Sequence, residues 1–186
     1  CAVFDRSGKM LAQAAHIPVH LGSMPASVTA AIESYGNDHP ASGDVVILND
    51  PYMGGTHLPD ITTVSPVFVG RRTSRTHWGW VATRAHHSDI GGMAPGSMPP
   101  STELFHEGLV IPPLKLVDAG VLDAQLVEII CRNVRTPEER LGDLSAQLAS
   151  HQIGERRIAA LADRYGTRTL TEKATTLLEY TQRLAQ

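Results

Sequence analysis

The central feature of this sequence is the stretch Ile61-Thr-Thr-Val-Ser-Pro-Val-Phe-Val69, followed closely by Thr76-His-Trp-Gly-Trp-Val-Ala-Thr-Arg-Ala85. Both segments are rich in Val, Thr, Phe and Trp, which favour β-strands. Gly70-Arg-Arg-Thr-Ser74 lies between them and has the composition of a turn. The two segments are therefore predicted to be strands joined by this turn.

Shorter extended segments lie on both sides of this pair. Cys1–Phe4 and Met10–Ala14 are predicted to form a hairpin with Gly8 in its turn. Asp44–Leu48 is a short apolar strand candidate, and Leu109–Leu116 is expected to be extended because its paired prolines forbid a helix. The first part of the chain is thus expected to build a sheet.

Helices are predicted from their capping residues. Ser23 can cap a helix with Pro25 in its first turn, and Thr136-Pro-Glu-Glu139 has the pattern of a capping box with proline at the first helical position. The expected helices are Ser23–Tyr35, Asp123–Asn133, Thr136–Tyr165, and Thr169 to the C-terminus.

The chain has two compositional parts. Residues 1–120 hold 11 of the 12 prolines, 13 of the 16 glycines and eight of the nine histidines. Because glycine and proline mark turns, we predict an α+β fold, with a loop-rich mixed β-sheet region over residues 1–120 and a helical region over residues 121–186. The helices carry no obvious chemistry and are expected to serve in packing and at interfaces.

Composition excludes several classes of protein. The chain has 186 residues, is 42% hydrophobic and carries 16 Lys+Arg against 19 Asp+Glu, a net charge of −3. A globular domain with a core is expected, and a nucleic-acid-binding protein is not. No apolar run reaches the ~20 residues of a membrane span, and no secretory leader is visible. The two cysteines are expected to be buried free thiols in a cytoplasmic protein.

The first group of chemically useful residues lies in Asn49-Asp-Pro-Tyr-Met-Gly-Gly-Thr-His-Leu-Pro-Asp60. His57 and Asp60 offer the imidazole and carboxylate ligands that Zn²⁺, Mn²⁺ and Fe²⁺ accept. Asp50, in the same loop, is a candidate for binding substrate. The plainer interpretation is that an aspartate before proline caps a turn and that a loop histidine is a polar side chain exposed to solvent.

The second group is Arg84-Ala-His-His-Ser-Asp-Ile-Gly-Gly92. Neighbouring side chains of a strand point to opposite faces, so His86 and His87 are not expected to bind the same ion. One would be a ligand, and the other would orient substrate or transfer a proton. Asp89 could hold the second ring nitrogen of a ligand, and Arg84 is a candidate for substrate binding. The alternative is a hydrogen-bonded histidine pair in a turn.

Two further stretches flank these groups. Glu103 or Glu107, in a loop rich in glycine and proline, could serve as a general base, although solvated loop carboxylates are the simpler interpretation. His16 and His20 are separated by a proline, and we interpret them as pocket-lining or structural residues.

The two main groups together predict a catalytic metal site without thiolate ligands. Such a metal lowers the pKa of bound water or polarises a carbonyl. The sequence has no phosphate-binding Gly-x-x-x-x-Gly-Lys-Ser/Thr motif and no Rossmann glycine fingerprint. Any ATP site is therefore expected on another domain or subunit.

Five blocks of the sequence begin at Ala14-Ala-His-Ile-Pro, Asn49-Asp-Pro-Tyr-Met, Arg84-Ala-His-His-Ser, Pro95-Gly-Ser-Met-Pro and Glu107-Gly-Leu-Val-Ile. In this order, and over residues 1 to about 140, they resemble the hydantoinase B/oxoprolinase family. That family includes the B subunit of ATP-dependent N-methylhydantoinase, the C-terminal part of 5-oxoprolinase and the metal-bearing subunits of acetone-type carboxylases.

The resemblance implies a division of labour between subunits. A hydantoinase A-type partner binds ATP and phosphorylates the carbonyl oxygen of the substrate, and the B part holds a divalent metal (Mn, Zn or Fe). The implied metal ligands are His57, Asp60 and His86, with a further aspartate just upstream of Cys1. Family members are longer, so the chain is expected to be a fragment of a larger, oligomeric catalytic subunit, inactive alone.

Two classes of function remain open at this point. The first is the B component of an ATP-dependent cyclic amide hydrolase, with His87, Asp89 and Glu107 as its catalytic candidates, or, within the same family, the metal-bearing subunit of a ketone carboxylase. The second is a non-catalytic interaction module in which the histidines are structural. The residues do not identify which small cyclic amide or ketone is bound.

Overall fold

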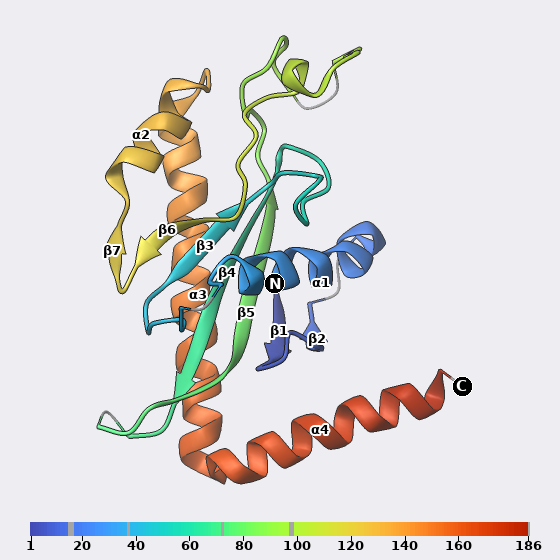
Figure 1. Cartoon of the computed structure of the whole chain (residues 1–186), viewed down its shortest axis with the longest axis vertical. Coiled ribbons are helices and arrows are strands. Elements are labelled where there is room, and N and C mark those ends of the chain that lie inside the picture. The colour runs from blue at the N-terminus through green and yellow to red at the C-terminus, as the bar shows by residue number, and fades with distance from the viewer. Residues whose placement is uncertain (15–16, 37, 72, 97–98, 186) are drawn as a thin grey trace.

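The computed structural model describes residues 1–14, 17–36, 38–71, 73–96 and 99–185. Its framework is a seven-stranded sheet in the order β2-β1-β5-β4-β3-β6-β7, and every pairing in it is antiparallel. Helices follow the sheet in the C-terminal part, and Figure 1 shows the long helix α3 running along one face. The α+β fold class is confirmed.

The centre of the sheet is the predicted hairpin. Strand β4 spans Asp60–Val69 and β5 spans Thr76–His86, with Asp60 opposite His86 at one end and Val69 opposite Thr76 at the other. Strand β4 is almost entirely buried and β5 is buried over its middle, because elements cover both faces of the sheet there, whereas both ends of β5 are exposed. The first and last residues of the hairpin, Asp60 and His86, therefore lie opposite each other at its open end.

The remaining strands are short. The predicted N-terminal hairpin is confirmed as β1 and β2, with Gly8 at φ +84° in its turn. The segment 109–113 forms no helix, as its prolines predict, and the strand that follows it begins at Leu114, whereas β7 was not predicted. The bounds are β1 Ala2–Asp5, β2 Met10–Gln13, β3 Val45–Leu48, β6 Leu114–Asp118 and β7 Val121–Leu122.

Helix α1, Pro18–Glu33, covers one face of the sheet (Figure 1). Met24 and Val28 pack in the same buried cluster as strand residues such as Val64. The predicted start at Ser23 is wrong: Pro18 occupies the first turn, where its missing N–H costs nothing, and the Ser23 hydroxyl donates to Val19 O at 2.8 Å inside the helix.

The opposite face is covered by α3, Pro137–Tyr165. Before it comes α2, Ala124–Arg132, whose predicted cap Asp123 accepts from two backbone N–H groups. The Thr136 side chain makes no capping hydrogen bond, so that part of the capping-box prediction is wrong. Helix α4, Thr167–Leu184, begins before Thr169 and leaves the end of α3 in a different direction (Figure 1), and its Thr171 accepts a hydrogen bond from Trp78 of β5 at 3.2 Å.

Some predictions fall on residues outside the described ranges. These are His16, Arg72 of the hairpin turn, and Ser97 and Met98 of the fourth family block. Cys1 is exposed and Cys131 is half-buried, so the prediction of two buried thiols is wrong, although both thiols are free. No helix in the described part of the chain has the length and apolar character needed to cross a membrane.

Candidate functional site

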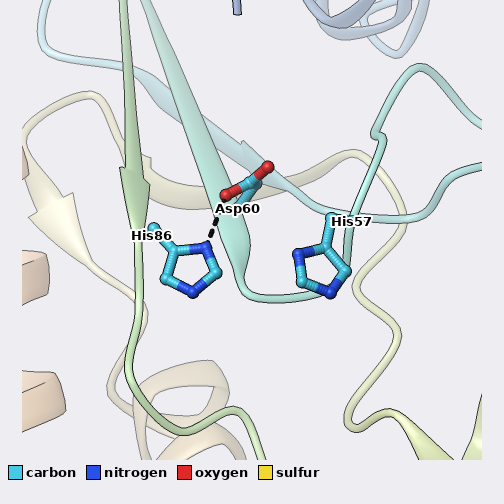
Figure 2. A group of neighbouring side chains, drawn as sticks. All are labelled: His57, Asp60 and His86. Atoms are coloured by element: carbon cyan, nitrogen blue, oxygen red, sulfur yellow. Dashed lines mark hydrogen bonds and ion pairs between the residues drawn. The ribbon is translucent and has the colours of Figure 1, made fainter. Parts of the chain in front are cut away.

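The three predicted metal ligands lie together at the end of the hairpin where β4 begins and β5 ends. Asp60 and His86 are direct cross-strand neighbours, and His57 precedes Asp60 by three residues. The N–H of Asp60 donates to His57 O at 2.8 Å, so the chain turns tightly there. Figure 2 shows the imidazole rings of His57 and His86 next to each other, with the Asp60 carboxylate above them and bonded to His86. We call His57, Asp60 and His86 the candidate metal triad.

The triad has the donor set of a divalent metal site. One ligand atom from each residue lies within 4.8 Å of the other two. His86 Nδ1 lies 2.9 Å from Asp60 Oδ1, and the rings of His57 and His86 stack with centroids 5.6 Å apart. The Asp60 side chain is 10% exposed and that of His86 is 48% exposed, so the site is anchored on one side and open on the other. Two imidazoles and a carboxylate suit Zn²⁺, Mn²⁺ or Fe²⁺.

The loop that carries His57 is held by Asn49, a fully buried residue that sequence reasoning left without a role. Its side-chain amide donates to Leu58 O at 2.7 Å and to Leu109 O at 2.9 Å, and its carbonyl accepts from the N–H of Ile111 at 2.6 Å. An asparagine after a buried strand and before a glycine-rich loop was the available signal. Asp50 accepts from the N–H of Tyr52 at 2.9 Å, as a turn cap does.

Arg84 lies on the same sheet face as the triad, next to it along β5. Its Nε donates to Thr62 Oγ1 at 2.8 Å, and its two terminal nitrogens donate to hydroxyls of α1, those of Ser23 and Ser27. Burial lowers the pKa of the guanidinium, and the Asp60 carboxylate opposes that change. Arg84 therefore places a positive charge beside the triad while fastening α1 to the hairpin.

His87 and Asp89 lie apart from the triad. His87 is 1% exposed, and its Nε2 lies 3.1 Å from Gln147 Oε1 of α3. Asp89 accepts from the guanidinium of Arg135 at 2.9 Å and from the N–H of Gly91 at 3.1 Å. Burial alone would raise the pKa of Asp89, but the backbone N–H groups of Arg135 and Gly91 and the Arg135 guanidinium outweigh it and hold the pKa below its usual value.

The other candidates lie in the loops and in α1. The half-buried Glu107 accepts from Ser101 Oγ at 3.1 Å, whereas Glu103 is exposed. His20 lies in the first turn of α1 and is half-buried. The structure thus brings together His57, Asp60 and His86, with Arg84 beside them, and places His87 and Asp89 against the C-terminal helices.

Comparison with known proteins adds a family to this geometry. The family model described as hydantoinase B/oxoprolinase matches residues 1–186. An uncharacterized protein, MJ0963, of Methanocaldococcus jannaschii is 45% identical over 185 residues, which are 98% of this chain and 32% of that protein. The 5-oxoprolinase of Saccharomyces cerevisiae is 40% identical over 182 residues, 91% of this chain and 14% of that enzyme.

A solved structure shows the same arrangement of elements. The crystal structure of the ATP-dependent caprolactamase from Pseudomonas jessenii superposes with a TM-score of 0.87 at 34% identity, over 98% of this chain and 31% of the other. The chain thus spans about a third of the length of the archaeal relative and of the caprolactamase chain.

Proposed function

The chain belongs to the hydantoinase B/oxoprolinase family, and from this premise we propose that it is part of the B component of an ATP-dependent cyclic amide hydrolase. The similar proteins named as a 5-oxoprolinase and a caprolactamase support this class of substrate. The single observation that carries the proposal is the candidate metal triad. One ligand atom from each of its three residues lies within 4.8 Å of the other two, at the open end of the hairpin.

We assign a separate role to each residue of the site. His57, Asp60 and His86 would hold a divalent metal, which when bound supplies Lewis-acid polarisation of the amide carbonyl. Asp60 is the fixed ligand, since it starts a buried strand, and the exposed ring of His86 leaves that side open to substrate. The positive charge of Arg84 would stabilise the negative charge that develops on the substrate oxygen during ring opening.

We expect ATP to bind to a partner subunit and not to this chain. The sequence contains no Gly-x-x-x-x-Gly-Lys-Ser/Thr motif, and the Pseudomonas jessenii relative is itself named as the beta subunit of a caprolactamase. A hydantoinase A-type subunit would therefore activate the carbonyl oxygen of the substrate, and this chain would complete ring opening. His87, Asp89 and Glu107 remain candidates for proton transfer and positioning.

The test is product analysis with the full-length protein and its A-type partner. Hydantoin, 5-oxoproline and caprolactam are each supplied with ATP, and His57→Ala and Asp60→Ala are compared with the exposed-site controls His39→Ala and Asp163→Ala. We expect ring opening to fall about 100-fold or more in the triad variants only. Unchanged metal content and activity in those variants would contradict the proposal, and carboxylation of a ketone with bicarbonate would assign the carboxylase alternative.

A further inference from the structure

One buried amide of the C-terminal part touches both strands of the site. Gln147 of α3 is 5% exposed. Its Nε2 donates to Ile61 O at 3.1 Å, and its Oε1 lies 3.1 Å from His87 Nε2. Ile61 follows Asp60 in β4, and His87 follows His86 at the end of β5. A single side chain therefore joins the residues next to two members of the candidate metal triad.

The chemistry of the amide permits one arrangement of these bonds. Because Ile61 O can only accept, the NH₂ group of Gln147 faces it, and the amide oxygen is left to accept from His87 Nε2–H. The NH₂ group also lies 3.4 Å from Thr83 Oγ1. All of these groups are buried, so breaking either bond leaves a polar atom unpaired in the interior. Gln147 thus links the two strand ends from the α3 face, in addition to the β4–β5 ladder that pairs Asp60 with His86.

Three other contacts hold the residues that follow His86 in place. The N–H of His87 donates to Pro59 O at 2.8 Å, which ties the end of β5 to the turn before Asp60. Arg140, 3% exposed, donates to Ser88 Oγ at 2.7 Å, and Arg135 pairs with Asp89 at 2.9 Å. Among the side chains in these contacts, Gln147 is the one that reaches both Ile61 of β4 and His87 after β5.

We propose that Gln147 is a positioning residue that sets the separation of Asp60 and His86 for metal binding. The side chain lies on the opposite face of the sheet from the triad and acts through the backbone of Ile61 and through His87. The proposal rests on the proposed function only in so far as the triad binds a divalent metal. It assigns to α3 a role in the site beyond packing.

The test compares Gln147→Leu with Gln152→Leu, the same change at an exposed position of the same helix. Zn²⁺ binding to the full-length protein is measured by calorimetry, and the Co²⁺ absorption spectrum reports ligand geometry. We expect Gln147→Leu to weaken Zn²⁺ binding about 10-fold and to shift the Co²⁺ bands, as loss of supporting groups around metal ligands does. Gln152→Leu should change neither.

Each outcome separates this proposal from the proposed function. If Gln147→Leu lowers only the melting temperature, while affinity and spectrum stay those of the unaltered protein, Gln147 is a packing residue and the proposal is wrong. If the unaltered protein binds no Zn²⁺ or Co²⁺ at the triad, the metal centre itself is wrong, and the proposal falls with it. Gln147→Met, unbranched like glutamine, replaces Gln147→Leu if that variant does not fold.

Discussion

Histidines of this protein have different chemistry because they lie in different surroundings. His86 ends β5 with an exposed side chain beside Asp60. His87, the next residue, is buried against α3, and burial lowers its pKa. His151 of α3 is buried among hydroxyls of the sheet: Nε2 lies 2.8 Å from Thr63 Oγ1, and Nδ1 lies 2.8 Å from Ser65 Oγ. These neutral partners satisfy an uncharged ring.

The stability of the fold is expected to fall as the pH drops from 6.5 to 4. Burial lowers the pKa of His151 to about 4, so the unfolded chain takes up a proton on this ring before the folded chain does. The linkage costs the native state about 3 kcal/mol across that range and nothing above it. Denaturant unfolding at a series of pH values measures this loss.

The control for this prediction is a pair of substitutions. In His151→Gln the loss between pH 6.5 and 4 should shrink, whereas the exposed-site variant His39→Gln should keep the slope of the unaltered protein. Equal slopes in all three proteins would show that His151 does not stay neutral in the fold.

At the scale of elements, β4, β5 and the bounds of α2 and α3 were predictable, whereas β7 and the starts of α1 and α4 were not. The β-branched and aromatic residues of β4 and β5 identify both strands to within a residue. The start of α1 was misplaced because Pro18 and Ser23 are both good N-terminal signals, and packing against the sheet selects the earlier one. The side chain of Thr136 caps nothing, although α3 begins at the predicted proline.

The loop between β3 and β4 passes so close to Asn49 that we expect it to tolerate only glycine at position 55. A Cβ on Gly55 would lie 2.1 Å from Asn49 O, whereas one on Gly22 of α1 would meet nothing within 4 Å. Gly55→Ala should therefore destabilise the fold by about 2 kcal/mol and displace His57. Gly22→Ala, the matched control, should stabilise it by up to about 1 kcal/mol, because alanine favours a helix.

Thermal unfolding and Zn²⁺ titration of both variants check this prediction. The melting temperature and the Zn²⁺ affinity should both fall in Gly55→Ala, and neither should fall in Gly22→Ala. A Gly55→Ala protein that melts and binds Zn²⁺ like the unaltered protein would show that the loop can move away from Asn49 at no cost.

Across the whole molecule, the site depends on parts far apart in sequence. That His57, Asp60 and His86 lie together was predictable from the family resemblance, which implied them as ligands, because residue types alone left open which of the paired histidines would join His57 and Asp60. The burial of His87 was not, since Gln147, which contacts it, lies 60 residues away on a helix without a sequence signal for chemistry. The two compositional parts of the chain therefore contribute to one structure, in which α3 supports the strands that carry the triad.

The measurement that tests the central claim most directly is anomalous X-ray diffraction from crystals of the protein grown with Zn²⁺. We predict one strong zinc peak bounded by His57, Asp60 and His86, with ligand distances of about 2.0–2.2 Å. The peak should disappear in Asp60→Ala and persist in Asp163→Ala. Zinc bound elsewhere on the chain, or an undiminished peak in Asp60→Ala, would contradict the claim that these three residues form the metal centre.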